Sequence, residues 1–128
     1  MRAGEHRLPI QLRDGLIYIQ AQVNGRRATL LVDTGAALTT FTLRAVPTLN
    51  TDSRITVNLA KGSVSAFRIP VGFIIGDPPQ RHCSFHQNAI VGNFKFLDAD
   101  GLIGQDVLTR FQSVTFDFKT SILILKDR

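Results

Sequence analysis

The sequence is poor in several residue types, and each shortage excludes a class of protein. Its 128 residues include one cysteine, Cys83, so no disulfide framework can form within the chain. No run of about eighteen apolar residues is present, which argues against a membrane-spanning helix. The first residues lack the apolar segment of a signal peptide. We therefore expect a soluble domain, cytoplasmic or the soluble part of a membrane-anchored protein, with no membrane contact within this segment.

The distribution of charge along the chain does not indicate a negatively charged binding partner. The formal net charge is +5, but the basic residues are scattered, and the tightest pair is Arg26 and Arg27. No alternation of basic and aromatic residues, as in proteins that bind single-stranded nucleic acid, is visible. The charge therefore indicates solubility and no nucleic-acid partner. A hydrophobic fraction of 44% over 128 residues is typical of one globular domain, residues 1–128.

Short alternating segments separated by turn signals run through the sequence. Residues 16–23 and 26–32 flank Asn24 and Gly25, a dipeptide typical of a two-residue type I′ hairpin turn. Further strands are expected over residues 8–12, 38–41, 55–59, 64–69, 71–76, 89–92, 114–118 and 121–125, with one short helix over 106–111. This pattern predicts an all-β barrel or sandwich.

One carboxylate stands at the end of a short apolar run. Residues 30–32 are apolar and include a β-branched valine, which suits a covered strand, and Asp33, Thr34 and Gly35 follow. A carboxylate there is costly to bury unless it is hydrogen-bonded or shares a proton, and the glycine permits a tight turn. Asp-Thr-Gly-Ala after an apolar strand resembles the signature of the aspartic proteases.

A second stretch, Gly-Leu-Ile-Gly-Gln-Asp-Val-Leu at residues 101–108, supports this resemblance. It is similar to the apolar-apolar-Gly element and short helix that pack behind the catalytic loop in retropepsin-like proteases. The resemblance covers residues 8–126 and implies a closed β-barrel of the retropepsin (acid protease) type with one short C-terminal helix. Ala37 and Gln105 stand where viral retropepsins often carry Asp and Arg, so the chain looks more like the bacterial or cellular branch.

The chemistry of an aspartic protease needs two carboxyl groups. One ionised group takes a proton from water while a protonated group polarises the carbonyl, and two carboxyl groups about 3 Å apart share one proton. The chain has a single Asp-Thr-Gly, and no other acid repeats its pattern. The sequence therefore implies a symmetric homodimer in which Asp33 from each copy meets on a two-fold axis.

The resemblance also implies roles for individual residues. Asp33 would be the catalytic carboxylate, Thr34 would bond across the dimer axis through its hydroxyl, and Gly35 would let the backbone approach the carboxylates. The substrate-binding residues it implies are Ala36, Ala37, Lys61, Gly62, Ser63, Val64, Leu97 and Asp98. Residues 61–65 would form the tip of a flap over the substrate. Residues 8–12 and 122–125 are candidates for terminal strands that interleave at the dimer interface.

His82, Cys83 and His86 lie close together in the sequence, a spacing that raises the alternatives of a metal site or a thiol protease. A metal site is disfavoured because no fourth ligand is evident. A thiol-protease pair is disfavoured because neighbouring residues on a strand point to opposite faces. No metal or cofactor is therefore expected. Two functions remain: an aspartic endopeptidase acting on peptides or proteins, which the intact motif favours, and a catalytically weak retropepsin-like dimerisation or peptide-binding module.

Overall fold

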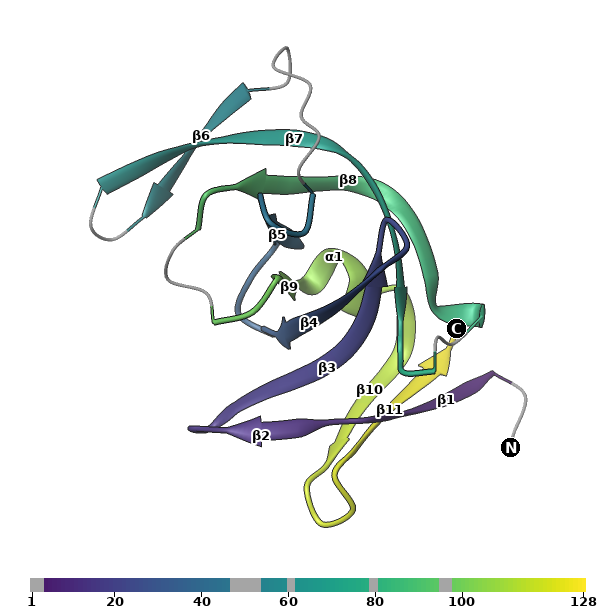
Figure 1. Cartoon of the computed structure of the whole chain (residues 1–128). Coiled ribbons are helices and arrows are strands. Elements are labelled where there is room, and N and C mark those ends of the chain that lie inside the picture. The colour runs from purple at the N-terminus through teal and green to yellow at the C-terminus, as the bar shows by residue number, and fades with distance from the viewer. Residues whose placement is uncertain (1–3, 47–53, 60–61, 79–80, 95–97) are drawn as a thin grey trace.

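The computed structural model describes residues 4–46, 54–59, 62–78, 81–94 and 98–128, and strands dominate it (Figure 1). The elements are β1 (Glu5–Pro9), β2 (Gln11–Arg13), β3 (Leu16–Val23), β4 (Arg26–Val32), β5 (Thr40–Thr42), β6 (Arg54–Leu59), β7 (Gly62–Ile75), a 3₁₀ turn (Arg81–Cys83), β8 (Ser84–Gly92), β9 (Gly101–Ile103), α1 (Gln105–Leu108), β10 (Phe111–Asp117) and β11 (Ile122–Asp127). The predicted all-β fold with one short helix is confirmed.

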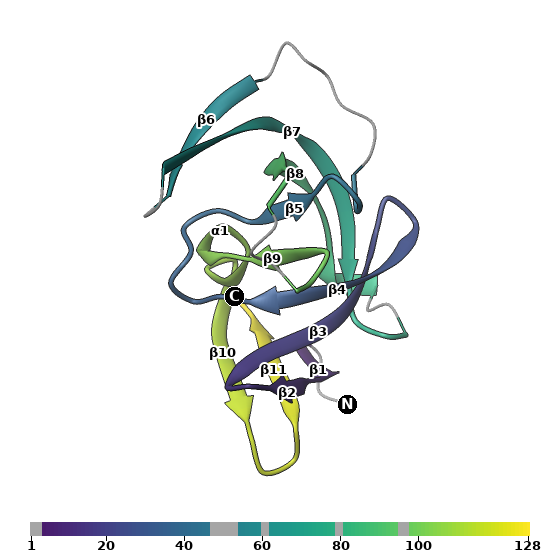
Figure 2. The ribbon, with the colours of Figure 1, turned by 60° about the vertical axis from the view of Figure 1, so that its left-hand side comes forward.

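The strands form two sheets. The larger has the order β2-β3-β4-β9-β5-β8-β7-β6, and an additional pairing of β3 with β7 joins its strands into a closed circuit. The smaller sheet has the order β1-β11-β10. The β6–β7 hairpin projects at one end of the molecule and the β10–β11 turn at the other (Figures 1 and 2). One hydrophobic cluster contains residues of both sheets, so the two sheets share a core.

The β3–β4 hairpin matches its prediction and delivers Asp33. Asn24 and Gly25 have φ angles of 50° and 81°, the two positive values that a type I′ turn requires. Leu30 is fully buried, which contributes about 2 kcal/mol to folding. Parallel pairing of β4 with β9 sets Val32 opposite Ile103, which belongs to the second motif. The hairpin therefore fixes where Asp33 emerges from the core.

Strand β7 corrects the prediction of two strands at 64–69 and 71–76, because the chain runs through Pro70 without a break. Among the described residues, β6 pairs with β7 as far as Phe67, and β3 pairs with it from Phe73 onward. Within the described part of the chain, the edge of β7 opposite β8 has no pairing partner at Pro70, where a missing N–H costs little. Strand β8 likewise begins at Ser84, earlier than the predicted 89, because it pairs with β7 as far as Ile74.

Helix α1 is shorter than the predicted 106–111. The chain leaves the helix after Leu108, and Phe111 begins β10. Phe111 is buried with its ring 6.2 Å from that of Phe85, so core packing draws this residue into the sheet. In the described part of the chain no helix is long and apolar enough to cross a lipid bilayer.

The terminal strands pair within the chain. Strand β11 lies between β1 and β10, with Leu8 opposite Leu123 in register. Leu8, Leu123 and Leu125 are almost completely buried. Both edges of β11 are therefore occupied, and the strand offers no free edge for the interleaving with a partner that the resemblance implies for residues 122–125.

Candidate active site

Asp33 lies in a tight hydrogen-bonded turn at the end of β4. Its backbone N–H donates to the carbonyl oxygen of Ile103 at 3.0 Å, and the Ala36 N–H donates to the Asp33 carbonyl oxygen at 3.2 Å. The Gly35 N–H donates to the carboxylate oxygen Oδ1 at 2.9 Å. Within the described residues the second oxygen, Oδ2, has no hydrogen-bond partner. One oxygen of the half-buried carboxylate is thus fixed by a hydrogen bond, and the other can take part in proton transfer.

The second motif packs directly behind this turn. The N–H groups of Gln105 and Asp106 donate to the carbonyl oxygens of Ala36 and Ala37 at 2.8 and 3.1 Å. A Cβ atom on Gly104 would stand 2.8 Å from the carbonyl carbon of Leu38, so only glycine permits this approach. The structure therefore brings together the two stretches that the sequence singled out.

A partly buried polar network supports the contact, and it was not predicted from the sequence. The Asp106 carboxylate accepts hydrogen bonds from the Thr39 hydroxyl at 2.7 Å and from the Thr39 N–H at 3.0 Å. It also accepts one from the Gln87 amide at 2.9 Å. Thr39 is fully buried, and its hydroxyl accepts a hydrogen bond from the Gly104 N–H. The only available signal was an aspartate directly after the second motif's glycine and glutamine.

Gln105 makes a further contact to the turn that carries Asp33. Its side-chain amide donates to the carbonyl oxygen of Thr34 at 2.7 Å. This is the position at which viral retropepsins often carry arginine. A neutral donor here fixes the backbone next to Asp33 without adding a charge.

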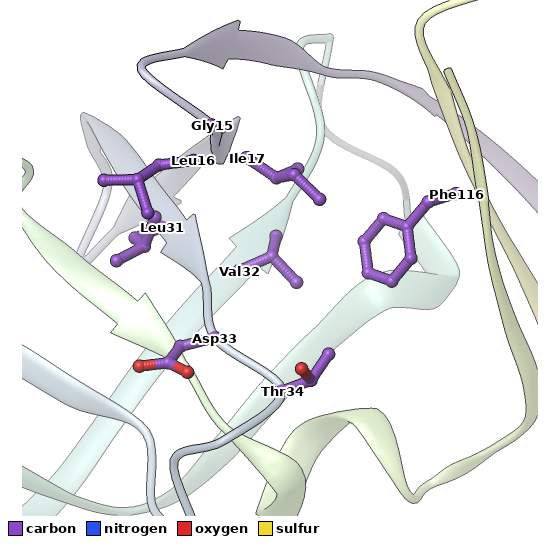
Figure 3. Close-up of a pocket in the computed structure, with 8 residues that line it drawn as sticks. All are labelled: Gly15, Leu16, Ile17, Leu31, Val32, Asp33, Thr34 and Phe116. Carbon is purple, nitrogen blue, oxygen red and sulfur yellow. The ribbon is translucent and has the colours of Figure 1, made fainter. Parts of the chain in front are cut away.

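The Thr34 side chain faces an open hollow. A cavity of about 410 Å³ is lined by Gly15, Leu16, Ile17, Leu31, Val32, Asp33, Thr34 and Phe116 (Figure 3). Asp33 and Thr34 point in different directions from the loop in this view. Among the described residues, the exposed Thr34 hydroxyl has no hydrogen-bond partner. Its predicted role across a dimer axis stays a prediction that this exposure permits.

A larger cleft lies on the other side of the turn. Its volume is about 710 Å³, and it is lined by Gly35, Ala36, Ala37, Leu38, Thr40, Ile55, Thr56, Val57, Asn58, Ile90, Phe94 and Leu102. Apolar walls with a few polar groups are typical of ligand sites. Ala36 and Ala37 were predicted to bind substrate, whereas the contribution of β6 was not.

Of the other predicted substrate residues, those that the structure describes lie outside the lining of this cleft. Gly62, Ser63 and Val64 begin β7 at the tip of the β6–β7 hairpin and do not line the cavity. Asp98 is exposed and also lies outside its lining. Lys61 and Leu97 lie outside the described residues. The hairpin packs through Ile55, Val57 and Val64 onto Ala66, Ile90 and Phe94.

The group His82, Cys83 and His86, considered above for a metal site or a thiol protease, combines a buried cysteine with exposed histidines. Cys83 is fully buried, and burial together with the nearby Asp127 charge raises the pKa of its thiol to about 11. Such a thiol is largely protonated and weakly nucleophilic at neutral pH. His82 and His86 are exposed. In the described part of the chain, no three His, Cys, Asp or Glu side chains are grouped so as to hold a metal ion.

Comparisons with known proteins agree with this geometry. Residues 19–110 match the family described as gag-polyprotein putative aspartyl protease. A retropepsin-like aspartic protease from Rickettsia conorii has a similar crystal structure, with 26% identity, a TM-score of 0.66 and coverage of 97% of this chain and 91% of that one. The EIAV protease, solved with the inhibitor HBY-793, is 18% identical with a TM-score of 0.54, covers 72% and 84% of the two chains, and shows the fold alone. No curated protein matches the chain. Because the family match spans well over half of its residues, this protein belongs to the retropepsin-like aspartic proteases.

Proposed function

We propose that the protein is an aspartic endopeptidase that acts as a homodimer. The observation that carries this proposal is the Asp33 carboxylate, held through Oδ1 by the Gly35 N–H with its second oxygen open. It stands beside an apolar cleft of about 710 Å³. Because one chain supplies one such carboxylate, the second must come from another copy.

The reaction adds water across a peptide bond. One Asp33 carboxylate, ionised, takes a proton from the water, whose oxygen attacks the carbonyl carbon while the other, protonated Asp33 donates its proton to the carbonyl oxygen. When the C–N bond breaks, the proton held by the dyad passes to the leaving nitrogen, and a hydroxyl group of the tetrahedral intermediate returns one proton to the dyad. The two carboxyl groups titrate as a pair.

The cleft indicates the kind of substrate. Ala36 and Ala37 are small and leave room beside the turn, while Ile55, Val57 and Leu102 make its walls apolar. An extended peptide with apolar side chains near the cleaved bond fits these walls. Closure of the β6–β7 hairpin as a flap would bring Lys61, Gly62, Ser63 and Val64 over the peptide, and Leu97 and Asp98 would line subsites, as the resemblance implies.

Cleavage of a peptide library rich in apolar residues tests the proposal. Asp33→Asn removes the acid–base function, so we expect a loss of at least about a thousandfold in kcat/KM. The matched control is Asp77→Asn, the same chemical change in an exposed ion pair with Arg27, near the other end of β4. We expect that control to cleave normally.

Two outcomes would contradict the proposal that the protein is an aspartic endopeptidase. An Asp33→Asn variant that cleaves as fast as the wild type would exclude Asp33 from catalysis. A wild-type protein that neither cleaves the library between pH 4 and 7 nor binds a statine-type transition-state mimic would instead be a dimerisation or peptide-binding module.

A further inference from the structure

A third cavity lies at the start of β4, and we call it the Arg26 cavity. Its volume is about 240 Å³. It is lined by residues of the β3–β4 hairpin, by Arg44 and Ala45, which follow β5, and by Asp100, which precedes β9. Strand β4 has seven residues, and at about 3.3 Å per residue its two ends are roughly 20 Å apart. The Arg26 cavity is therefore remote from Asp33, which follows the other end of the strand.

The lining of this cavity is part apolar and part basic. Its apolar residues are all buried, and they are Val23, Ala28 and Ala45. Its basic residues are all exposed, and they are Arg26, Arg27 and Arg44. The first two arginines are neighbours in the sequence, but only the fold adds Arg44 to them. Folding thus gathers positive charge that the scattered basic residues of the sequence did not reveal.

Carboxylates neutralise this charge only in part. The Arg44 Nε donates to Oδ1 of Asp100 at 2.9 Å. Arg27 forms an ion pair with Asp77, which lies outside the lining. Within the described residues, Arg26 has no acidic partner. Three guanidinium groups therefore meet one carboxylate in the lining and a second beside it, which leaves a net positive charge at the cavity.

The arginines also keep hydrogen-bond donors that the chain does not use. A guanidinium group carries five N–H donors in a planar fork that matches phosphate and carboxylate oxygens. Among the described residues, Arg44 uses its Nε for Asp100 and its Nη2 for the Ala99 carbonyl oxygen at 3.4 Å. Exposed ion pairs contribute little to stability, so an arriving anion can share these guanidinium groups at little cost.

We propose that the Arg26 cavity binds a phosphate group. A phosphate dianion presents at least three acceptor oxygens, one for each guanidinium group, whereas a carboxylate presents two. The volume of about 240 Å³ lies below the roughly 300–1,000 Å³ of pockets for drug-sized molecules, so the cavity fits one such group. A free phosphate ion and a phosphorylated peptide offer the same chemistry. The inference goes beyond the proposed function and does not depend on it.

Titration with inorganic phosphate, followed by NMR of the backbone amides, tests the proposal directly. The ionic strength is held constant with sodium chloride, so that screening of the surface charges does not change during the titration. We expect saturable shifts of the amides of Ala28 and Ala45 at millimolar phosphate. Sodium chloride alone at the same ionic strength should leave these signals in place.

Neutral variants of the basic residues identify the groups that bind. Arg26→Gln and Arg44→Gln each remove a charge-assisted donor, so we expect the phosphate dissociation constant to rise at least about fivefold in each. The matched control is Arg68→Gln, at an exposed arginine of β7 that does not line the cavity. That variant loses the same net charge and should bind phosphate like the wild type.

A gain of affinity gives a second measurement, which a folding defect does not mimic. Asp100→Asn removes the negative charge from the lining, and its remaining oxygen can still accept the hydrogen bond that the Thr29 N–H donates at 2.9 Å. We expect this variant to bind phosphate several-fold more tightly than the wild type, because the anion no longer competes with a carboxylate for Arg44.

The outcomes separate a site from the attraction of any anion to a basic protein. Chloride shifts equal to those of phosphate, or an affinity that Arg26→Gln and Arg44→Gln leave unchanged, would overturn the Arg26 cavity. Equal weakening in Arg68→Gln would overturn it as well, because net charge alone would then explain binding. If the site holds, a phosphoserine peptide that binds more tightly than inorganic phosphate and than its serine counterpart assigns it to a phosphorylated peptide, and equal or weaker binding assigns it to the free ion. The Asp33→Asn variant should bind phosphate normally whatever the cleavage assay shows.

Discussion

The two sides of the Asp33 turn differ in what holds them. On the inner side, the Gly104 backbone lies against Leu38, and the fully buried Thr39 is bonded to the Asp106 carboxylate. On the outer side, Thr34 is exposed without a partner for its hydroxyl in the described chain, and Phe118 is 56% exposed. One side of the turn is closed by the chain itself, and the other is open.

This difference separates two requirements of an aspartic protease. The position of a carboxylate must be fixed to a fraction of an ångström, and a network of short hydrogen bonds within one chain achieves this. In the proposed homodimer the second carboxylate comes from another copy, so the surface that receives it has to stay uncovered in the single chain. We therefore expect inner-side substitutions to lower the free energy of unfolding and outer-side substitutions to change assembly.

The largest effect on stability is expected at Asp106. Asp106→Ala would leave the Thr39 N–H, the Thr39 hydroxyl and the Gln87 amide without their acceptor. We expect a loss of about 3 kcal/mol in the free energy of unfolding, measured by urea denaturation. Asp106→Asn keeps one acceptor oxygen and should lose less than half as much. Equal losses in the two variants would show that the carboxylate is not the source of the inner side's stability.

A somewhat smaller loss is expected at Gly104. In Gly104→Ala the new methyl group would stand 2.9 Å from the Ala36 carbonyl oxygen, which is backbone and cannot turn aside. We expect about 2 kcal/mol of destabilisation, with a parallel fall in activity because the turn that carries Asp33 must shift. Gly72→Ala is the matched control, since its methyl group would meet only the His86 ring at 3.6 Å. A Gly104→Ala variant as stable as that control would mean that the backbone around Gly104 has room for a methyl group.

Gln105 should affect catalysis more than stability. Gln105→Ala removes the hydrogen bond to the Thr34 carbonyl oxygen, and we expect about 1 kcal/mol of destabilisation. Because the bond positions the turn and does not touch the substrate cleft, kcat should fall several-fold with KM little changed. Gln105→Arg restores a donor and should recover most of the rate, whereas Gln105→Glu should not.

Gln11→Ala, at an exposed glutamine of β2, controls for the loss of a glutamine side chain. If Gln105→Ala raised KM and left kcat unchanged, Gln105 would act on substrate binding instead. The contact would then not belong to the inner side of the turn.

The fold was predictable from the sequence only where local signals acted. Asn24 and Gly25 dictate their turn through φ, so the bounds of β3 and β4 were predicted correctly. The strand break expected at Pro70 is wrong because, among the described strands, that edge of β7 has no partner at Pro70, and which edge is paired is a property of the whole sheet. Thr39 and Asp106 are 67 residues apart, and nothing local joins them. Long-range pairings of this kind depend on topology, which residue patterns leave open.

The outer side should show the smallest change in stability and a clear change in assembly. Thr34→Val keeps the shape of an exposed side chain and removes only its hydroxyl, so the free energy of unfolding of the dilute chain should change by less than about 0.5 kcal/mol. If the hydroxyl bonds across the axis, the dimer dissociation constant should rise about tenfold, while Thr34→Ser, which retains the hydroxyl, should dimerise nearly as well as the wild type. Denaturation of the dilute protein and sedimentation of the concentrated protein measure the two quantities separately.

A Thr34→Val chain as unstable as Gly104→Ala would mean that Thr34 contributes to the stability of the single chain. The distinction between a closed and an open side of the turn would then be wrong at Thr34, the residue next to Asp33. It matters most there, because a turn that its own chain covers on both sides leaves no surface for a second carboxylate to approach.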